Sequence, residues 1–244
     1  MQVALLFLFG LLIGTVIIAL GGGGGAFYLG VLTAVFQLDP AQAAATSLVT
    51  AIPSILIGVI GYWRGHKIDF HLGNQMLIAA LPAVIIGALI SPYIPKPLYK
   101  WIIGIILTWL GCRIFIKHSK KQTHDGKWAA RLYGILAGLM VGVAGLSGGG
   151  PILAGLLILG EDLFRATATS AYVLSGMCLL GAILHTTSGQ VNWPVGIPLM
   201  LGAIIGAILA PRLMDLLSKK PQSGKYIQTF IAILLIVMGV KTVL

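Results

Sequence analysis

The sequence predicts an all-α polytopic membrane protein made of two inverted repeats, each a glycine-tipped helical hairpin followed by three transmembrane helices. The first observation is composition: 58% of the 244 residues are hydrophobic and only 9% are charged, whereas a soluble domain carries roughly 25% charged residues. The second is that several apolar stretches reach the roughly 20 residues that a helix needs to cross a bilayer. The third is an internal repeat. Helices are the default spanning element because each one satisfies its own backbone hydrogen bonds in lipid.

The internal repeat extends over both halves of the chain. Five glycines of the first half recur in the second half at a constant spacing: Gly10, Gly14, Gly21, Gly24 and Gly25 match Gly134, Gly138, Gly145, Gly148 and Gly149. After a slip of one residue, the segment DPAQAAATS at 39–47 matches DLFRATATS at 162–170. We therefore expect a first repeat at 1–117 and a second at 132–244, joined by a polar linker loop at 118–131. Many transporters are built from two such halves.

Both halves follow one plan. Each opens on an apolar segment that glycines interrupt, at 2–37 and at 132–160. Three uninterrupted spans follow in each half, at 41–62, 73–92 and 97–117 and then at 165–186, 194–212 and 225–244. Small residues at a spacing of four are typical of closely packed membrane helices. Such spacings join Gly10 to Gly14, Gly134 to Gly138 and Gly142, and Gly202 to Gly206.

The charged loops indicate how the interrupted segments lie. Short cytoplasmic loops are enriched in Lys and Arg, so we expect the basic linker 118–131 in the cytoplasm. If the segment 132–160 crossed only once, the later loop with Arg212, Lys219, Lys220 and Lys225 would lie outside, whereas a hairpin puts it inside. The same reasoning makes 2–37 a hairpin and places both termini outside. We expect a multi-pass protein of the cell membrane with six full crossings and two hairpins. Its N-terminal stretch is expected to be retained, because it lacks the basic start of a signal peptide.

The glycine tips predict a binding site for a small anion. In each hairpin the glycines lead into a second limb, which begins near Ala26 or Pro151. The first N–H groups of a helix have no partner within it and carry a partial positive charge, and glycines let a ligand approach them closely. Two oppositely inserted tips would meet near the middle of the membrane, where such folds bind substrate. Carbonyl groups before Gly21 could instead coordinate a cation, so a carrier of cations or neutral solutes is the alternative.

The expected substrate-binding residues are the two tips and a Thr-Ser pair in the next helix of each half. They are Gly22, Gly23, Gly24, Gly25, Thr46, Ser47, Ser147, Gly148, Gly149, Gly150, Thr169 and Ser170. The hydroxyl groups could donate to ligand oxygens, or they could bond a preceding carbonyl of their own helix. Asp39 and Asp162 are expected to cap the next span, with proton coupling as the alternative role. Arg165 could gate transport or gather substrate, or it could simply extend to the membrane surface.

Other classes of protein find little support in the sequence. Cys112 and Cys178 are isolated and no metal-ligand spacing occurs, so neither a metal nor another cofactor is expected. HExxH, GxSxG and ATP-binding motifs are missing, which argues against an intramembrane enzyme and against an ATP-driven pump. The net charge of +10 comes mostly from loop residues that orient the chain, so no nucleic-acid partner is expected. A scaffold role would leave the glycine symmetry unexplained.

Together these residues resemble the sulfite exporter TauE/SafE family of membrane permeases. The motifs are GGGGG, DPAQAAATSLVT and YWRGHKIDF in the first half and GLSGGGP, RATATS and SGQVNW in the second. The resemblance implies a prokaryotic-type transporter in the lipid bilayer, with sulfite, sulfonates or related organosulfur anions as substrates. We therefore expect a secondary anion exporter that works by alternating access, and we leave its homo-oligomeric state open. Two departures are that 27–30 lacks the proline the family often has there, and that Asn192 stands where the first half has Asp69.

Overall fold

A computed structural model describes residues 2–19, 25–115, 126–145, 148–161, 163–187 and 189–218, together with 233, 236, 237 and 240. Within these ranges the fold is all-helical. The helices are α1 (Gln2–Ala19), α2 (Gly25–Ala34), α3 (Pro40–Arg64), α4 (Phe70–Ile90), the short 3-10 helix η1 (Ser91–Tyr93), α5 (Lys96–Phe115), α6 (Gly126–Ala144), α7 (Gly149–Ile158), α8 (Leu163–Thr187) and α9 (Trp193–Ser218). The all-α prediction is confirmed for this part of the chain.

The helix boundaries agree with the apolar pattern, with one difference. The glycine-interrupted segments divide into α1 with α2 and into α6 with α7, and the expected spans at 41–62 and 165–186 correspond to α3 and α8. However, α6 begins at Gly126, inside the segment expected to be linker. The reason is that hydropathy marks only the part of a helix that lies in lipid, whereas Ala, Lys and Arg continue a helix beyond it. Apart from four residues, the expected span at 225–244 lies outside the described ranges.

The two limbs of each hairpin differ in length. The first limbs, α1 and α6, have 18 and 19 residues, whereas the second limbs, α2 and α7, have 10 each. At a rise of about 1.5 Å per residue, ten residues span about 15 Å, which is about half of a hydrocarbon core of roughly 30 Å. The second limbs are therefore too short to cross a membrane.

Several described helices are apolar enough to lie in a membrane. Three of them are also long enough to cross it: Pro40–Arg64, Phe70–Ile90 and the Arg165–Thr187 part of α8. Shorter apolar stretches occur at Gln2–Thr15, Gly25–Ala34, Trp128–Ala144 and Trp193–Leu209. This pattern is that of a polytopic membrane protein.

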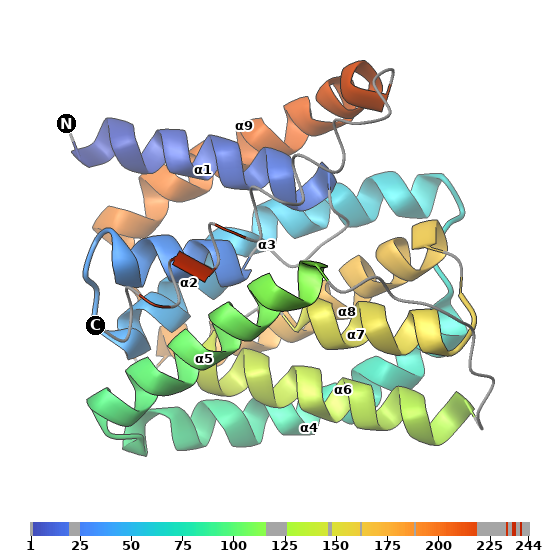
Figure 1. The fold of residues 1–244 in the computed structure, drawn as a ribbon, viewed down its shortest axis with the longest axis horizontal. Coiled ribbons are helices and arrows are strands. Elements are labelled where there is room, and N and C mark those ends of the chain that lie inside the picture. The colour runs from blue at the N-terminus through green and yellow to red at the C-terminus, as the bar shows by residue number, and fades with distance from the viewer. Residues whose placement is uncertain are drawn as a thin grey trace.

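The helices lie side by side along the long axis of the molecule. In Figure 1, α1 and α9 lie along one edge, α4 and α6 lie along the other, and α3 and α8 run between them. The start of α8 contacts the residue before α4, and the start of α3 contacts the residue before α9, so α3 and α8 are antiparallel. The two short limbs, α2 and α7, begin near the middle of the long axis and run to opposite ends (Figure 1).

The two edge pairs are held together by glycines. In each pair a Cβ added to a glycine would overlap a backbone carbonyl of the facing helix. These contacts join Gly10 to Leu199, Gly14 to Ala203, Gly202 to Phe7 and Gly206 to Leu11 in one pair, and Gly134 to Met76, Gly138 to Ala80 and Gly142 to Val84 in the other. The contacts advance in the same direction on both helices, so each pair is parallel. The expectation that these glycine spacings serve close helix packing is confirmed.

Corresponding loops of the two halves also share an unusual backbone conformation. Gln37 follows α2 with a φ of 52°, and Gly160 follows α7 with a φ of 93°. His66 follows α3 with a φ of 51°, and Gly189 follows α8 with a φ of 68°. Residues other than glycine rarely adopt this left-handed region of backbone conformation. The same turn is therefore made at matching places, once with glycine and once without.

Substituting Gly138 by alanine should destabilise the fold. The new Cβ would overlap the carbonyl of Ala80 and lie 2.9 Å from the Cβ of Ala83, and overpacking of this kind costs about 1–3 kcal/mol. We expect a lower melting temperature of the detergent-solubilised protein, measured as the loss of its monodisperse peak in size-exclusion chromatography after heating. Gly61→Ala is the control, because Gly61 is exposed on α3 and a Cβ there would meet nothing within 4 Å. Equal melting temperatures for Gly138→Ala and the wild type would contradict the close approach of α4 and α6.

Candidate functional site

The second glycine tip is held by the first half of the chain. Gly145 follows α6 with a φ of 61°, and a Cβ there would lie 2.5 Å from the Cα of Ala44 on α3. The hydroxyl group of Ser47 lies 3.0 Å from the carbonyl oxygen of Gly145 and 2.8 Å from that of Ala44, and it donates to these acceptors. Ser47 therefore bonds a carbonyl of its own helix, the alternative role considered for it, and at the same time it anchors the tip. Its contact with substrate stays a prediction.

The described glycines of both tips lie in the interior of the molecule. Gly25 opens α2 and is buried, as are Gly148 and Gly149 at the start of α7, while Gly150 is half-buried. A Cβ at Gly148 would lie 2.7 Å from the Cβ of Ala137 on α6, so the limbs of the second hairpin pack closely at its tip. Three further predicted binding residues of the first tip, Gly22, Gly23 and Gly24, lie outside the described residues, as do Ser147 and Asp162.

Thr46 and Thr169 tie each half of the chain to a helix start in the other half. The Thr169 hydroxyl oxygen accepts the backbone N–H of Asp69 at 2.9 Å, just before α4. The Thr46 hydroxyl oxygen accepts the backbone N–H of Asn192 at 3.0 Å, just before α9. Both threonines are fully buried. Each oxygen is thus an acceptor for the protein, and its own O–H group remains a potential donor to a ligand.

Asp69 and Asn192, whose N–H groups donate these bonds, are also helix caps. The side chain of Asp69 accepts the N–H of Leu72 at 3.0 Å, and the side chain of Asn192 accepts the N–H of Val195 at 3.3 Å. Both satisfy an N–H group that has no partner inside the helix. Asp69 and Asn192 were not among the predicted site residues, although their matching places in the short turns of the two halves were a usable signal.

Asp39 has the position expected of it but not the expected contact. It is the residue before α3 and precedes Pro40, yet its side chain makes no capping hydrogen bond. Its backbone carbonyl accepts the N–H of Ala43 at 2.8 Å instead. The capping expectation is therefore wrong for the side chain. Pro40 removes one of the N–H groups that would otherwise have no partner inside the helix.

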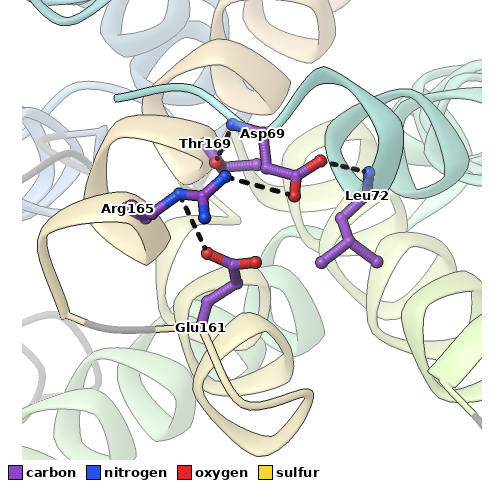
Figure 2. Close-up of polar contacts among 5 residues, drawn as sticks. All are labelled: Asp69, Leu72, Glu161, Arg165 and Thr169. Carbon is purple, nitrogen blue, oxygen red and sulfur yellow. Dashed lines mark hydrogen bonds and ion pairs between the residues drawn. The ribbon is translucent and has the colours of Figure 1, made fainter. Parts of the chain in front are cut away.

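A charged cluster lies at the end of the molecule where α4 and α8 begin. Figure 2 shows Arg165 between two carboxylates. Its Nη2 lies 3.6 Å from Oδ2 of Asp69, and its Nε lies 3.5 Å from Oε2 of Glu161. The Arg165 side chain is 51% exposed, so the two ion pairs contribute little to stability, about 0–1 kcal/mol each. They link the start of α8, the start of α4 and the loop after α7.

Among the residues that the structure describes, the opposite end of the molecule has no such cluster. At the positions that correspond to Asp69, Arg165 and Glu161, the other half has Asn192, Gln42 and Leu38. Because Arg165 makes ion pairs with Asp69 and Glu161, it does not simply extend toward the surface, which was one of the roles considered for it. The spacing of four between Glu161 and Arg165 was visible in the sequence, whereas the pairing with Asp69 depends on how α4 and α8 meet.

The interior has polar groups but few that carry charge. Its buried polar residues, among those described, are Thr15, Thr33, Thr46, Ser47, Thr50, Ser54, Ser91, Thr169, Ser170 and His185. None is Lys, Arg, Asp or Glu. Over the same ranges, no group of three or more His, Cys, Asp or Glu side chains could hold a metal ion. A ligand bound among these helices would depend on hydroxyl groups and on the N–H groups of helix starts.

Comparison with known proteins agrees with this architecture. The model of the family described as "Sulfite exporter TauE/SafE" matches residues 6–242. The "Probable membrane transporter protein YjnA" of Bacillus subtilis is 25% identical over 97% of this chain and 98% of its own length. The "Probable membrane transporter protein YfcA" of Escherichia coli K12 is 28% identical over 91% of this chain and 83% of its own length. An "Undecaprenyl-diphosphatase" of Bradyrhizobium diazoefficiens is 28% identical, but only over 52% of this chain.

Replacing Thr169 by valine should weaken the junction between α8 and α4. Valine keeps the shape but removes the acceptor for the Asp69 N–H, and an unpaired buried polar group costs about 1–3 kcal/mol. We expect a lower melting temperature of the purified protein by differential scanning fluorimetry. Thr169→Ser is the control, because it keeps the hydroxyl oxygen and should remain closer to the wild type. A valine variant as stable as the serine variant would show that this hydrogen bond contributes nothing.

Proposed function

Because the chain belongs to the sulfite exporter TauE/SafE family of membrane proteins, we propose that it is a secondary transporter of small anions that works by alternating access. It is a membrane transporter, and we propose sulfite, sulfonates or related organosulfur oxyanions as its substrates and export as its direction. The family description motivates the substrate class. The geometry of the interior motivates the preference for anions.

The observation that carries this proposal is the pair of buried helix starts. The short limbs α2 and α7 both begin at glycines that lie inside the molecule, at Gly25 and Gly149. The first N–H groups of each limb have no partner within the helix and carry about half an elementary positive charge. The described interior offers no carboxylate that would compete for them. An anion could bind to such donors without any formal positive charge nearby.

We further propose that the two halves are inverted repeats in the membrane. Three features support this arrangement: the parallel edge pairs use matching glycines, α3 and α8 are antiparallel, and α2 and α7 run to opposite ends of the long axis. The proposed topology has six full crossings and two hairpins, with the linker 118–131 in the cytoplasm and both termini outside. Two related halves that rock about a central site are the usual basis of alternating access.

A flux assay separates the proposed function from its alternatives. The wild-type protein would be reconstituted in proteoliposomes and tested with sulfite, thiosulfate and sulfoacetate, and in parallel with inorganic cations and neutral solutes. Flux of at least one sulfur oxyanion, and of no cation, supports the proposal. Flux of cations alone would favour a cation carrier in the same fold. Release of phosphate from a polyprenyl diphosphate would instead favour an enzyme, the class to which the diphosphatase relative belongs.

Leucine at the two tips should abolish transport. In Gly149→Leu the new side chain would cover the N–H groups at the start of α7, and Gly24→Leu makes the same change in the residue before α2, so we expect anion flux to fall by at least tenfold in each variant. Membrane insertion should be retained, measured as the amount of protein recovered from the membrane fraction. Gly61→Ala is again the matched control and should transport like the wild type. Unchanged flux in both leucine variants would end the proposal that the tips bind substrate.

Of the three residues expected to gate or couple transport, Arg165 has contacts that support a gating role. We propose that its ion pairs with Asp69 and Glu161 close one end of the transport path. Asp69→Asn should slow or deregulate anion flux severalfold while leaving the melting temperature nearly unchanged, because asparagine keeps the cap, as Asn192 does, and exposed ion pairs add little stability. Arg165→Gln should have the same effect, and the double variant should be no worse than either single one. Wild-type flux in both single variants would rule out the gate.

A further inference from the structure

Among the described residues, the buried hydroxyl groups of Tyr28, Ser54 and Ser170 have no hydrogen-bond partner, and the first two of them lie side by side. Tyr28 lies in the first turn of α2, one turn after Gly25, and Ser54 lies on α3 beside it. Both side chains are fully buried. Within the described part of the chain, the phenol oxygen of Tyr28 and the hydroxyl oxygen of Ser54 lie near each other, but neither has a partner at the geometry of a hydrogen bond. Nearly all buried polar groups in native proteins do have a partner, so the pair requires an explanation.

The energetic cost makes an accidental origin a poor explanation. Burying a hydroxyl group without a partner costs about 1–3 kcal/mol, and the two groups lie side by side. Phenylalanine and alanine would fill nearly the same volume without that cost. This cost is understandable if the hydrogen-bond partner of the two hydroxyl groups is a ligand that is bound only part of the time.

The second half of the chain provides an internal comparison. The residues that correspond to Tyr28 and Ser54 are Ile152 on α7 and Met177 on α8, and both are fully buried. The same place in the fold is therefore filled by apolar side chains in the other half. Packing alone does not call for hydroxyl groups here, and their presence in only one half indicates a task that the halves do not share.

Their position connects the two hydroxyl groups to the start of α2. Tyr28 lies three residues after the glycine that opens this helix, so it belongs to the same first turn as the N–H groups that have no intrahelical acceptor. Tyrosine and serine hydroxyls can each donate one hydrogen bond, and hydrogen bonds to a charged acceptor are roughly twice as strong as those between neutral groups. An oxygen atom of an anion is an acceptor suited to both kinds of donor.

We propose that Tyr28 and Ser54 form an oxyanion-binding subsite of the transport path, which donates two hydrogen bonds to the substrate beside the start of α2. The inference rests on the proposed function and deepens it. Ile152 and Met177, at the matching places of the second half, carry no hydroxyl group, so the two halves would offer the substrate different donors there.

The test compares hydroxyl-deletion variants with a matched tyrosine control. Tyr28→Phe and Ser54→Ala each remove a single oxygen atom. Tyr172→Phe removes the same oxygen atom elsewhere, where the phenol donates to Oδ1 of Asn74 at 2.7 Å on the exposed side of α8. All three variants would be reconstituted in proteoliposomes, and KM would be measured for sulfite and for sulfoacetate.

We expect KM to rise at least tenfold in Tyr28→Phe and in Ser54→Ala, and to stay within about twofold in Tyr172→Phe. The melting temperature without anion should not fall in the first two variants, since no hydrogen bond is lost, while the increase in melting temperature that added sulfite or sulfoacetate causes should shrink. If the wild-type protein transports anions and both deletion variants have the same KM as the wild type, the subsite is overturned. The proposed function would still stand. An inactive wild type with every anion would overturn both.

Discussion

In lipid, two apolar helices gain little by covering each other's side chains, so their association depends on how closely their backbones can approach. Here that approach is made by glycines, which line both members of the pair α1 and α9 and both members of the pair α4 and α6, where Gly87 of α4 faces Gly142 of α6. At each contact there is no room for even one methyl group next to the facing carbonyl. The two edge pairs hold the helices between them, α3 and α8, in a fixed position, and the polar contacts of the interior depend on that position.

The position of α3 and α8 between the edge pairs allows hydrogen bonds between the two halves of the chain. Because α3 and α8 are antiparallel, the start of each lies next to the end of the other, and Thr46 and Thr169 reach the backbone just before α9 and α4. Ser47, one residue after Thr46, reaches the second glycine tip. One Thr-Ser pair thus serves two purposes: it stabilises a helix start and it anchors a hairpin. Sequence motifs shared by both halves are often explained by substrate alone, but part of this motif has a structural role.

The differences between the halves carry as much information as the repeat. At one end a cluster of charges joins α4, α8 and the loop after α7, whereas the other end has Asn192, Gln42 and Leu38 at the same places. In the middle, a pair of hydroxyl groups in the first half stands where the second half has isoleucine and methionine. At these two places the two halves of the chain therefore differ in charge and in hydrogen-bonding groups.

The sequence by itself determined the helical class, the break of each first segment at its glycines and the use of the glycine spacings, because each of these follows from local composition and from a repeat along the chain. It also indicated the family through motifs in both halves. It did not identify the partners of Arg165 or the role of Asp69, and it assigned Asp39 a side-chain cap that the structure does not show. Tyr28 and Ser54 looked like ordinary members of apolar spans. Such contacts join residues that are far apart in the chain, and only the packing of one helix against another decides which hydroxyl group meets a partner and which is left without one.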